Sequence, residues 1–251
     1  MTPSWSVMSD DKPYLTISLI VPAHNEEKYI WTCLEHILRH ADGHIHEIIV
    51  IDNASTDDTK KIAEQYPGVR VITEHTKWLT HARQRWYKEA TGDVLAFVDA
   101  DTRMPKWWAK LLKQHFESSN DIWFVSWPYH YYDLPWYKQI GNRLYRRLLW
   151  YPSYLLIWYL WVGGNFAIKK SVLDTIDWFD TKIVFYGEDT DIARRAAKCS
   201  TTKFTLRLVM PTSARRFVWE GMLKTAYTYI TNFLSQVLFH KSATKTYKDF
   251  R

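Results

Sequence analysis

Residues 15–27 read LTISLIVPAHNEE, and the order of residue types in this stretch decides the fold of the first half of the chain. A short apolar run, Leu15–Val21, ends at Pro22, which is typical of a buried strand. The segment that follows, Glu26–Ala41, repeats apolar residues at the 3.6-residue period of an amphipathic helix. A strand followed directly by a helix predicts a unit of an α/β fold.

This strand–helix unit recurs along the chain. Further strands are predicted at Glu47–Ile51, Val69–Thr73, Asp93–Val98 and Asp121–Trp127. The helix after the second strand is expected to begin with a capping-box pattern at Ser55. A further helix is expected over Leu79–Ala90, and another with Pro105 in its first turn. Regular alternation implies a doubly wound, mostly parallel sheet of Rossmann-like type with helices on both faces. In such sheets ligands bind beyond the carboxyl ends of the strands.

The composition suits one folded domain of this kind. The chain has 251 residues, of which 47% are hydrophobic and 24% charged, and single α/β domains reach about 200–250 residues. A net charge of +6 and a pI of about 9.1 favour an anionic partner, whether nucleic acid, a phospholipid surface or a phosphorylated small molecule. Cys33, on an apolar helix stripe, is expected to be a core thiol, and neither it nor Cys199 lies in a metal-binding pattern. The N-terminus lacks the features of a signal peptide, so we predict a cytoplasmic protein, with the cytoplasmic face of a membrane as the alternative.

The alternation stops after Trp127, where an aromatic-rich insert begins. Residues 128–162 are crowded with Trp, Tyr and Arg and follow no simple period. Residues 148–162 are nearly all apolar, but this run is shorter than the roughly 20 residues that a spanning helix needs, and Pro152 interrupts it. Core packing, stacking of aromatic rings on an acceptor sugar, peripheral membrane contact and a dimer interface all stay open. Three arginines directly before the run favour membrane contact: Arg143, Arg146 and Arg147.

Polar motifs interrupt the apolar runs at four places. They are residues 22–27 (PAHNEE), residues 52–57 (DNASTD), residues 99–101 (DAD) and residues 187–191 (GEDTD). Carboxylates at the ends of parallel strands can reach one crevice. Two acids spaced by one residue suit Mg²⁺ or Mn²⁺, which bind hard oxygen ligands. Each motif also has a simpler interpretation, as a helix cap or as exposed loop acids.

Taken together and in this order, VPAHNEE, DNASTDDT, DAD and GEDTD resemble the motifs of the family 2 glycosyltransferases with the GT-A fold. The resemblance covers roughly residues 15–216, and Gly163-Gly164-Asn165 matches a further short segment of the family. It implies metal-dependent, inverting transfer of a sugar from a nucleoside-diphosphate sugar, with UDP favoured, to a glycan or lipid-linked acceptor. The QxxRW motif of processive synthases is absent, which favours a non-processive enzyme.

The resemblance also implies a role for each matching position. The strand end that cradles the nucleotide corresponds to Pro22, Ala23, Asn25 and Glu26, the acid that reads the base to Asp52, and a basic contact to base or phosphate to Arg83. The donor contacts correspond to Asp99, Ala100 and Asp101, with Asp101 as main metal ligand and Asp99 beside it, and candidate diphosphate contacts, or a solvated basic turn, to Arg215 and Arg216. The catalytic base corresponds to Asp189, the residue that orients the acceptor to Glu188, and the acceptor side to Gly163, Gly164, Asn165 and Trp161.

We expect a single domain over residues 1–251, with a donor-binding half at 13–102, an acceptor and catalytic half at 103–216 and a helical tail at 217–251. A non-catalytic module with the same fold is the main alternative. A sugar nucleotidyltransferase is less favoured because the loop after the first strand is acidic rather than rich in glycine and basic residues. No nucleic-acid-binding motif occurs, so no nucleic-acid partner is expected. Nothing in the sequence predicts the oligomeric state.

Overall fold

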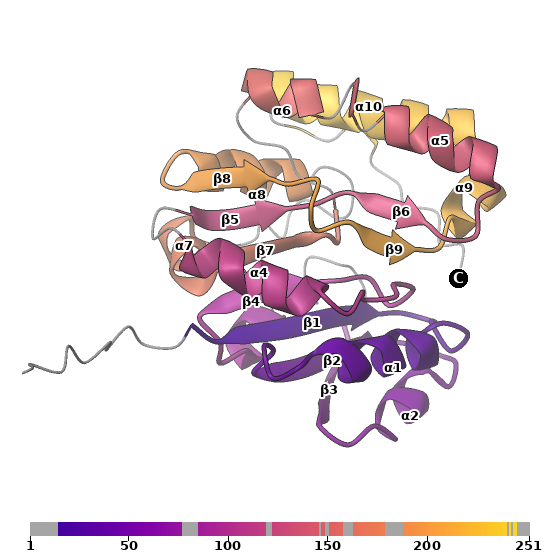
Figure 1. Cartoon of the computed structure of the whole chain (residues 1–251), viewed down its shortest axis with the longest axis vertical. Helices are drawn as coiled ribbons and strands as arrows, with labels where there is room; N and C mark the ends of the chain where they lie inside the picture. Colours follow the sequence, from indigo (N-terminus) through magenta and orange to yellow (C-terminus); the bar gives the residue numbers. More distant parts are fainter. Residues whose placement is uncertain are drawn as a thin grey trace, which may run out of the picture.

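A mostly parallel sheet runs through the computed structural model, which describes residues 15–76, 85–118, 122–145, 147–148, 151–157, 163–178, 188–239, 241 and 243–244. The sheet has seven strands in the order β3-β2-β1-β4-β7-β5-β8 (Figure 1). These strands are β1 (Ile17–Ala23), β2 (Glu47–Asn53), β3 (Val69–Glu74), β4 (Val94–Phe97), β5 (Ile122–Ser126), β7 (Phe166–Lys169) and β8 (Thr201–Phe204). Only β7 runs antiparallel to its neighbours, so the predicted mostly parallel α/β sheet is confirmed.

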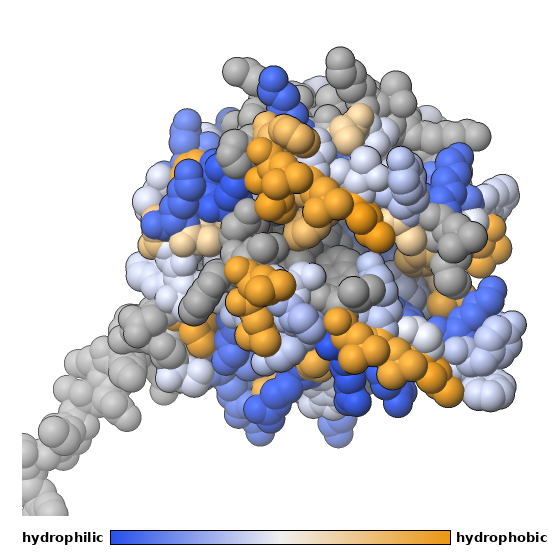
Figure 2. Space-filling view, turned by 90° about the horizontal axis from the view of Figure 1, so that it is seen from above, coloured by the Kyte–Doolittle hydropathy of each residue, from blue (hydrophilic) through white to orange (hydrophobic). Residues whose placement is uncertain are grey.

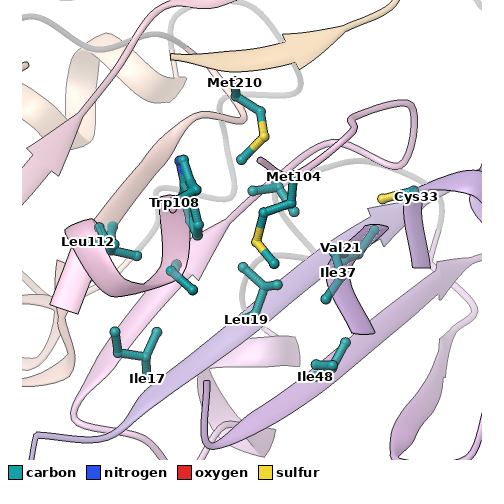
Figure 3. Close-up of a cluster of buried hydrophobic side chains, with 14 of the residues drawn as sticks. Ile17, Leu19, Val21, Cys33, Ile37, Ile48, Met104, Trp108, Leu112 and Met210 are labelled. Atoms are coloured by element: carbon teal, nitrogen blue, oxygen red, sulfur yellow. The ribbon is translucent and has the colours of Figure 1, made fainter. Parts of the chain in front are cut away.

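Helices cover both faces of this sheet. They include α1 (Ile30–His40), α2 (Thr59–Ala63), α4 (Trp108–Glu117), α7 (Lys170–Thr175), α8 (Glu188–Ala197) and a helix at residues 85–89. Successive side chains of a strand point to opposite faces, so Leu19 packs with α1 and α4 while Ile20 packs with α7 and α8. Figure 3 shows the first of these cores, with Ile37 of α1 and Trp108 of α4 directed toward β1. Strands buried on both faces explain why their sequences are continuously apolar.

The second half of the chain adds a smaller sheet and a group of helices. β6 (Tyr129–Tyr131) pairs with β9 (Met210–Thr212) in a parallel two-stranded sheet. The remaining helices are α5 (Trp136–Tyr145), α6 (Tyr151–Ile157), α9 (Arg215–Glu220) and α10 (Met222–Phe239). Helices α5, α6 and α10 lie together beyond the β8 edge of the main sheet, at the top of Figure 1. No helix in the described ranges is both long and apolar enough to cross a bilayer.

Three local predictions need correction or comment. The helix expected from Ser55 begins only at Thr59, because the Ser55 hydroxyl accepts a hydrogen bond from the Asn25 amide (3.1 Å) instead of capping. The helical tail expected from residue 217 onward is divided at Gly221, whose φ of 83° lies outside the helical region. The expectation for Cys33 is confirmed, since its thiol is buried beside Thr102.

Candidate functional site

The carboxyl ends of β1, β2 and β4 meet at one edge of the sheet. Ala23, the last residue of β1, lies opposite Asp52 of β2, and Asp99 follows β4 by two residues. This is the edge at which ligands bind in parallel sheets. Asp52 and the Asp-x-Asp motif therefore come together as predicted, although they are separated by more than forty residues of sequence.

The loops that follow β1 and β2 are bonded to each other by side chains. The Thr56 amide donates to Asn25 Oδ1 (2.8 Å), and the Glu26 amide donates to Thr59 Oγ1 (2.7 Å). Asn25 and Ala54 adopt left-handed backbone conformations with φ of 51° and 54°. Such conformations in residues other than glycine persist where the surroundings fix them. The strand end expected to cradle a nucleotide is thus ordered without a ligand, and the side-chain amide of Asn25 holds the two loops together.

Asp52 presents a buried carboxylate at this edge. Its side chain is 3% exposed, and Oδ1 has no hydrogen-bond partner within the part of the chain that the structure describes. The neighbouring Asn53 contrasts with it, since its amide nitrogen donates to the carbonyl oxygen of Thr76 (2.8 Å). A buried oxygen without a donor is costly, so this position suits a ligand that brings an N–H or O–H group. Arg83 lies outside the described residues.

Arg215 joins the loop after β1 to the Asp-x-Asp motif. Its Nη2 atom lies 2.5 Å from Glu26 Oε1, and its Nε atom lies 3.0 Å from Asp101 Oδ2. The guanidinium carbon is 4.6 Å from the centre of the Tyr29 ring. Thr212 Oγ1 donates to the second oxygen of Asp101 (2.9 Å). The chain therefore returns from residue 212 onward to complete a site begun by the first strand.

The charges around Arg215 favour its ionised form. Burial acts to lower the pKa of Arg215, but its hydrogen bond to Glu26 and the charge of Asp101 outweigh burial and raise that pKa above its ordinary value. Glu26 and Asp101 are themselves almost completely buried. Two buried carboxylates around one guanidinium leave a net negative charge. Such a place attracts further positive charge.

Asp99 is held by Tyr129 of β6. The Tyr129 hydroxyl contacts Asp99 Oδ2 and also lies 2.6 Å from the carbonyl oxygen of Gly163, so its single hydrogen serves one of the two acceptors at a time. Burial, followed by the charge of Asp99, raises the pKa of Tyr129 well above its ordinary value. Tyr129 is therefore a hydrogen-bond donor at neutral pH.

A glycine turn separates Asp99 from Asp189. A Cβ atom on Gly164, whose φ is +78°, would lie 2.6 Å from both Asp99 Oδ2 and the Tyr129 hydroxyl. A Cβ atom on Gly163 would lie 2.9 Å from Asp189 Oδ2. Both distances are shorter than van der Waals contact, so any side chain at either position would displace these groups. The two glycines allow the two carboxylates to approach opposite sides of one turn.

The remaining predicted positions differ in how they relate to this edge. Asp189, the second residue of α8, accepts a hydrogen bond from the Thr190 amide at Oδ1 (2.7 Å). Asn165 is fully buried, and its side-chain amide has no hydrogen-bond partner in the described ranges. Arg216 pairs with Glu220 (3.4 Å) and lies 5.2 Å from the centre of the Tyr229 ring. The Glu188 side chain and Trp161 lie outside what the structure describes.

Sequence reasoning missed three residues that build the site: Tyr129, Thr212 and Asp133. Asp133 accepts hydrogen bonds from the Ser213 hydroxyl (2.6 Å) and from the Ala214 amide (2.7 Å). It therefore fixes the chain directly before Arg215 and sets the place of that guanidinium. No local pattern signals this role, because Asp133 and Ser213 are 80 residues apart. The sequence pointed to this part of the chain only through Arg215 and Arg216, as candidate diphosphate contacts.

The acids of the Asp-x-Asp motif are suitable ligands for a divalent cation, with a condition. Asp99 and Asp101 supply the hard oxygen atoms that Mg²⁺ and Mn²⁺ prefer. Both oxygens of Asp101 are engaged, one by Thr212 and one by Arg215. Within the described residues, no group of three or more His, Cys, Asp and Glu side chains is placed to hold a metal. Each oxygen of Asp101 keeps a second lone pair, so a cation there would share Asp101 with Arg215 and Thr212 and take its remaining ligands from outside this set.

Similar proteins are found by sequence over part of the chain. YibD of Escherichia coli (strain K12), an uncharacterised glycosyltransferase, is 33% identical over 111 residues, which are 42% of this chain and 32% of YibD. The dolichol-phosphate mannosyltransferase of Pyrococcus furiosus is 30% identical over 112 residues, which are 43% of this chain and 32% of that protein. The match thus spans about a third of the length of these curated relatives.

Similar solved structures cover more of the chain. Glucosyl-3-phosphoglycerate synthase from Mycobacterium tuberculosis, in complex with Mn²⁺ and UDP-glucose, aligns with a TM-score of 0.66 and 21% identity over 94% of this chain and 84% of that one. Staphylococcus aureus TarS aligns with a TM-score of 0.64 and 19% identity over 90% of this chain and 73% of that one. These likenesses confirm the predicted GT-A-like fold. Residues 18–177 match the family model for glycosyl transferase family 2, and the chain belongs to that family.

Proposed function

We propose that this chain transfers a sugar from a nucleoside-diphosphate sugar to an acceptor hydroxyl, with inversion and in a non-processive manner. One observation carries the proposal: the turn at Gly163 and Gly164 brings Asp99, at the end of β4, and Asp189, at the start of α8, to its two sides. One carboxylate can thus face the donor while the other faces the acceptor. In inverting transfer the nucleophile and the leaving group stand on opposite faces of the sugar.

The donor occupies the edge formed by β1, β2 and β4. Pro22 and Ala23 line this edge through their backbone, and the unpartnered Oδ1 of Asp52 accepts a hydrogen bond from the base or ribose. We favour UDP, which is the nucleotide in the Mycobacterium tuberculosis structure of similar fold. Arg83 as a further base or phosphate contact stays a prediction. The donor-binding half corresponds to residues 13–102 and the acceptor half to residues 103–216.

The diphosphate lies near Arg215, Asp101 and Asp99. Arg215 provides a charged guanidinium at this place, and guanidinium groups bind phosphate oxygens through paired N–H donors. Asp101 and Asp99 are the residues that would hold Mn²⁺ or Mg²⁺. When bound, such an ion neutralises the charge that develops on the diphosphate leaving group. Arg215 adds positive charge to the same leaving group through N–H donors that its pairs with Glu26 and Asp101 leave over.

Asp189 acts as the general base. It removes the proton of the acceptor hydroxyl while the acceptor oxygen bonds to the anomeric carbon and the bond from that carbon to the diphosphate oxygen breaks. Glu188, beside it, orients the acceptor, which is a glycan or a lipid-linked group. The acceptor lies along Gly163, Gly164 and Asn165, with Trp161 as a stacking surface. The buried amide of Asn165, without a partner among the described residues, suits a polar contact on this side.

Thermal shift with nucleotides tests the donor site. Wild type and Asp101→Ala are each heated with UDP, GDP or dTDP, and with Mn²⁺, Mg²⁺ or a chelator. Because a ligand that binds only the native state raises the melting temperature, we expect a metal-dependent rise with UDP that is lost in Asp101→Ala. No rise with any nucleotide would overturn the donor site. A rise without turnover of any UDP-sugar would favour the alternative, a non-catalytic binding module.

A further inference from the structure

The exposed apolar side chains of the molecule are concentrated in one group of helices. We call α5, α6, α9 and α10 the outer helical layer. Apart from Trp31 and Trp107, every large apolar side chain that is exposed in the described ranges lies in this layer or, for Leu148, between α5 and α6. Leu156 of α6 is 80% exposed and Trp136 of α5 is 74% exposed. Figure 2, which looks down on this layer, shows groups of hydrophobic side chains on the face, with most hydrophilic residues toward the edge of the view.

Helix α10 buries polar side chains on its inner side, beside Phe233, and exposes apolar side chains on its outer side. Its buried residues include Thr225, Asn232 and Gln236, which recur at intervals of seven and four and so share one face. Its exposed residues include Tyr227, Ile230, Leu234 and Leu238, which recur at intervals of three and four on the other face. A surface helix in water has the opposite arrangement. The outer side of α10 is therefore built for an apolar environment.

The layer is nonetheless fixed to the fold on its inner side. Tyr154 of α6 donates to the carbonyl oxygen of Thr202 in β8 (3.1 Å). Tyr154 and Phe233 of α10 both pack against Phe204 at the end of β8. The layer thus also covers the last strand of the main sheet, whose outer edge would otherwise be open. The exposed apolar side chains therefore belong to helices that are packed against the main sheet.

The charge on the layer decides between possible partners. Residues 136–157 contain Lys138, Arg143, Arg146 and Arg147 and no Asp or Glu. In α9 and α10 the only acid is Glu220, which already pairs with Arg216 (3.4 Å). Basic side chains around apolar and aromatic ones are the composition of helices that lie in the plane of an anionic membrane surface. A second copy of this chain would bring a like-charged face against it, which costs free energy.

We infer that the outer helical layer is a docking surface for the interface of an anionic phospholipid bilayer. The aromatic side chains Trp136, Trp219 and Tyr227 lie at headgroup level, where rings with one polar edge are favoured. Leu156 and Leu238 reach the acyl chains, and Lys138 and Arg143 contact lipid phosphates. The layer lies on the membrane and does not span it.

Docking in this way places the reaction site next to the bilayer. Arg215, which contacts Glu26 and Asp101, is the first residue of α9 and so belongs both to the site and to the layer. An acceptor attached to a membrane lipid can then reach Asp189 without leaving the bilayer surface. This consequence rests on the proposed function, whereas membrane binding itself does not.

Flotation with vesicles tests the inference on the full chain. Wild type, the double variant Leu156→Glu/Leu238→Glu and the control Trp31→Glu are mixed with phosphatidylcholine vesicles that contain or lack phosphatidylglycerol, at low and high salt. Trp31 is 51% exposed but lies on α1, away from the layer. We expect wild type and Trp31→Glu to float with the anionic vesicles at low salt, and the double variant to lose at least tenfold in bound fraction. All three side chains are exposed, so melting temperatures should stay within about 2 °C of each other.

Three results would overturn the inference. Wild type that binds neither kind of vesicle, or a double variant that binds as well as wild type, removes the docking surface. A wild-type dimer in solution that the double variant abolishes, without vesicle binding, makes the layer a self-interface instead. Lys138→Glu/Arg143→Glu provides a second variant with the apolar side chains intact, and it should lose the preference for phosphatidylglycerol. UDP binding measured on the same variants keeps the two proposals separate, since either can fail while the other stands.

Discussion

The loops after β1 and β2, which we call the first region, and the outer helical layer, the second, differ in which side chains they bury and which they expose. In the loops, polar groups of Asn25, Ser55, Thr56 and Thr59 bond to one another, and the strands behind them are buried on both faces. In the layer, α10 buries Asn232 and turns apolar side chains outward. The first region bonds its own loops together and leaves Asp52 Oδ1, which has no donor among the described residues, for a ligand. The second leaves apolar side chains exposed, and we infer that a bilayer surface covers them.

On the proposed function, this difference indicates that the loops select the donor and the layer the acceptor. A preformed set of loops pays little ordering entropy when a ligand binds, so it suits a small donor that must be placed accurately. If the outer helical layer docks on a bilayer, as we infer, it selects the acceptor by location, because an acceptor held at the same surface can reach the site next to it. Arg215 connects the two regions, which makes the junction testable by single substitutions.

The largest expected effect is on the rate of sugar transfer, and it separates activation of the acceptor from binding of the donor. Asp189→Asn removes the proposed base but keeps its size, so we expect transfer to fall by about 10²–10⁴-fold. UDP affinity should change by less than about twofold, since the donor edge of β1, β2 and β4 is untouched. Initial rates with a UDP-sugar and titration of UDP measure the two quantities.

Asp58→Asn is the matched control for this substitution. Asp58 is mostly exposed and pairs only loosely with Lys61 (3.8 Å), so transfer should stay near the wild-type rate. A variant Asp189→Asn that retains transfer would assign the base elsewhere. Loss of UDP affinity in the same variant would mean that the two regions are not separable.

A pair of adjacent arginines tests the junction. Arg215→Met removes the guanidinium shared by Glu26 and Asp101, whereas Arg216→Met removes one directed at Glu220. Removal of one preorganised donor to a developing anion costs about 10²–10³-fold in rate, so we expect a loss of that order for Arg215→Met. Its UDP affinity should fall as well, and its melting temperature should drop, because two buried carboxylates then lack their partner.

Arg216→Met should stay within about threefold of wild type in rate and UDP affinity, since its ion pair with Glu220 lies within α9 and not at the donor edge. Equal losses in both variants would indicate that α9 as a whole matters and not the contact of Arg215. The opposite ranking, with Arg216 the more sensitive, would contradict the arrangement of the site.

The sequence predicts the first region better than the second for a physical reason. Buried strands and their polar ends follow short periods, so local patterns put Asp52, Asp99 and Asp101 at strand ends, and the resemblance to the family 2 glycosyltransferases implies their roles. The place of Arg215 depends on Asp133, which lies 80 residues before Ser213 in the chain and carries no local signal. Tyr129 is similar, since only the folded β6 brings its hydroxyl to Asp99. Contacts of this kind are properties of topology.

For the outer helical layer, the sequence does not predict which side of each helix faces the fold. Periodicity predicts a helix over most of α10, but a period does not say which side of the helix faces inward. The apolar positions of this tail suggest a core-facing stripe, yet Ile230 is exposed and Asn232 is buried. Ser55 shows the same limit on a smaller scale, because its hydroxyl can cap a helix or join two loops and the sequence does not distinguish these uses.

The smallest expected effect is on the free energy of unfolding, and it concerns the amino end of β2, opposite the loops of the first region. Glu47, at the start of β2, accepts hydrogen bonds from the Ser18 hydroxyl (2.6 Å) and the Thr91 amide (2.7 Å) and pairs with Arg70 (3.1 Å). Burial alone would raise the pKa of Glu47, but the hydrogen bonds from Ser18 and Thr91 outweigh it and lower the pKa from 4.5 to about 2. The folded pKa lies below the unfolded one, so this stabilisation is complete above about pH 5 and is lost as the pH falls toward 2.

Glu47→Gln should therefore lower the free energy of unfolding by about 1 kcal/mol at pH 7, and the difference from wild type should shrink steadily between pH 5 and pH 2. Urea unfolding at several pH values measures it, with Glu64→Gln, an exposed residue 3.8 Å from Lys60, as the control that shows no such trend. A difference that does not depend on pH would mean that Glu47 acts through packing and not through its charge. UDP affinity should be equal in both variants, since Glu47 lies at the amino end of β2 and the donor edge at its carboxyl end. A loss of UDP affinity in Glu47→Gln would show instead that the bonds at the two ends of the first region depend on each other.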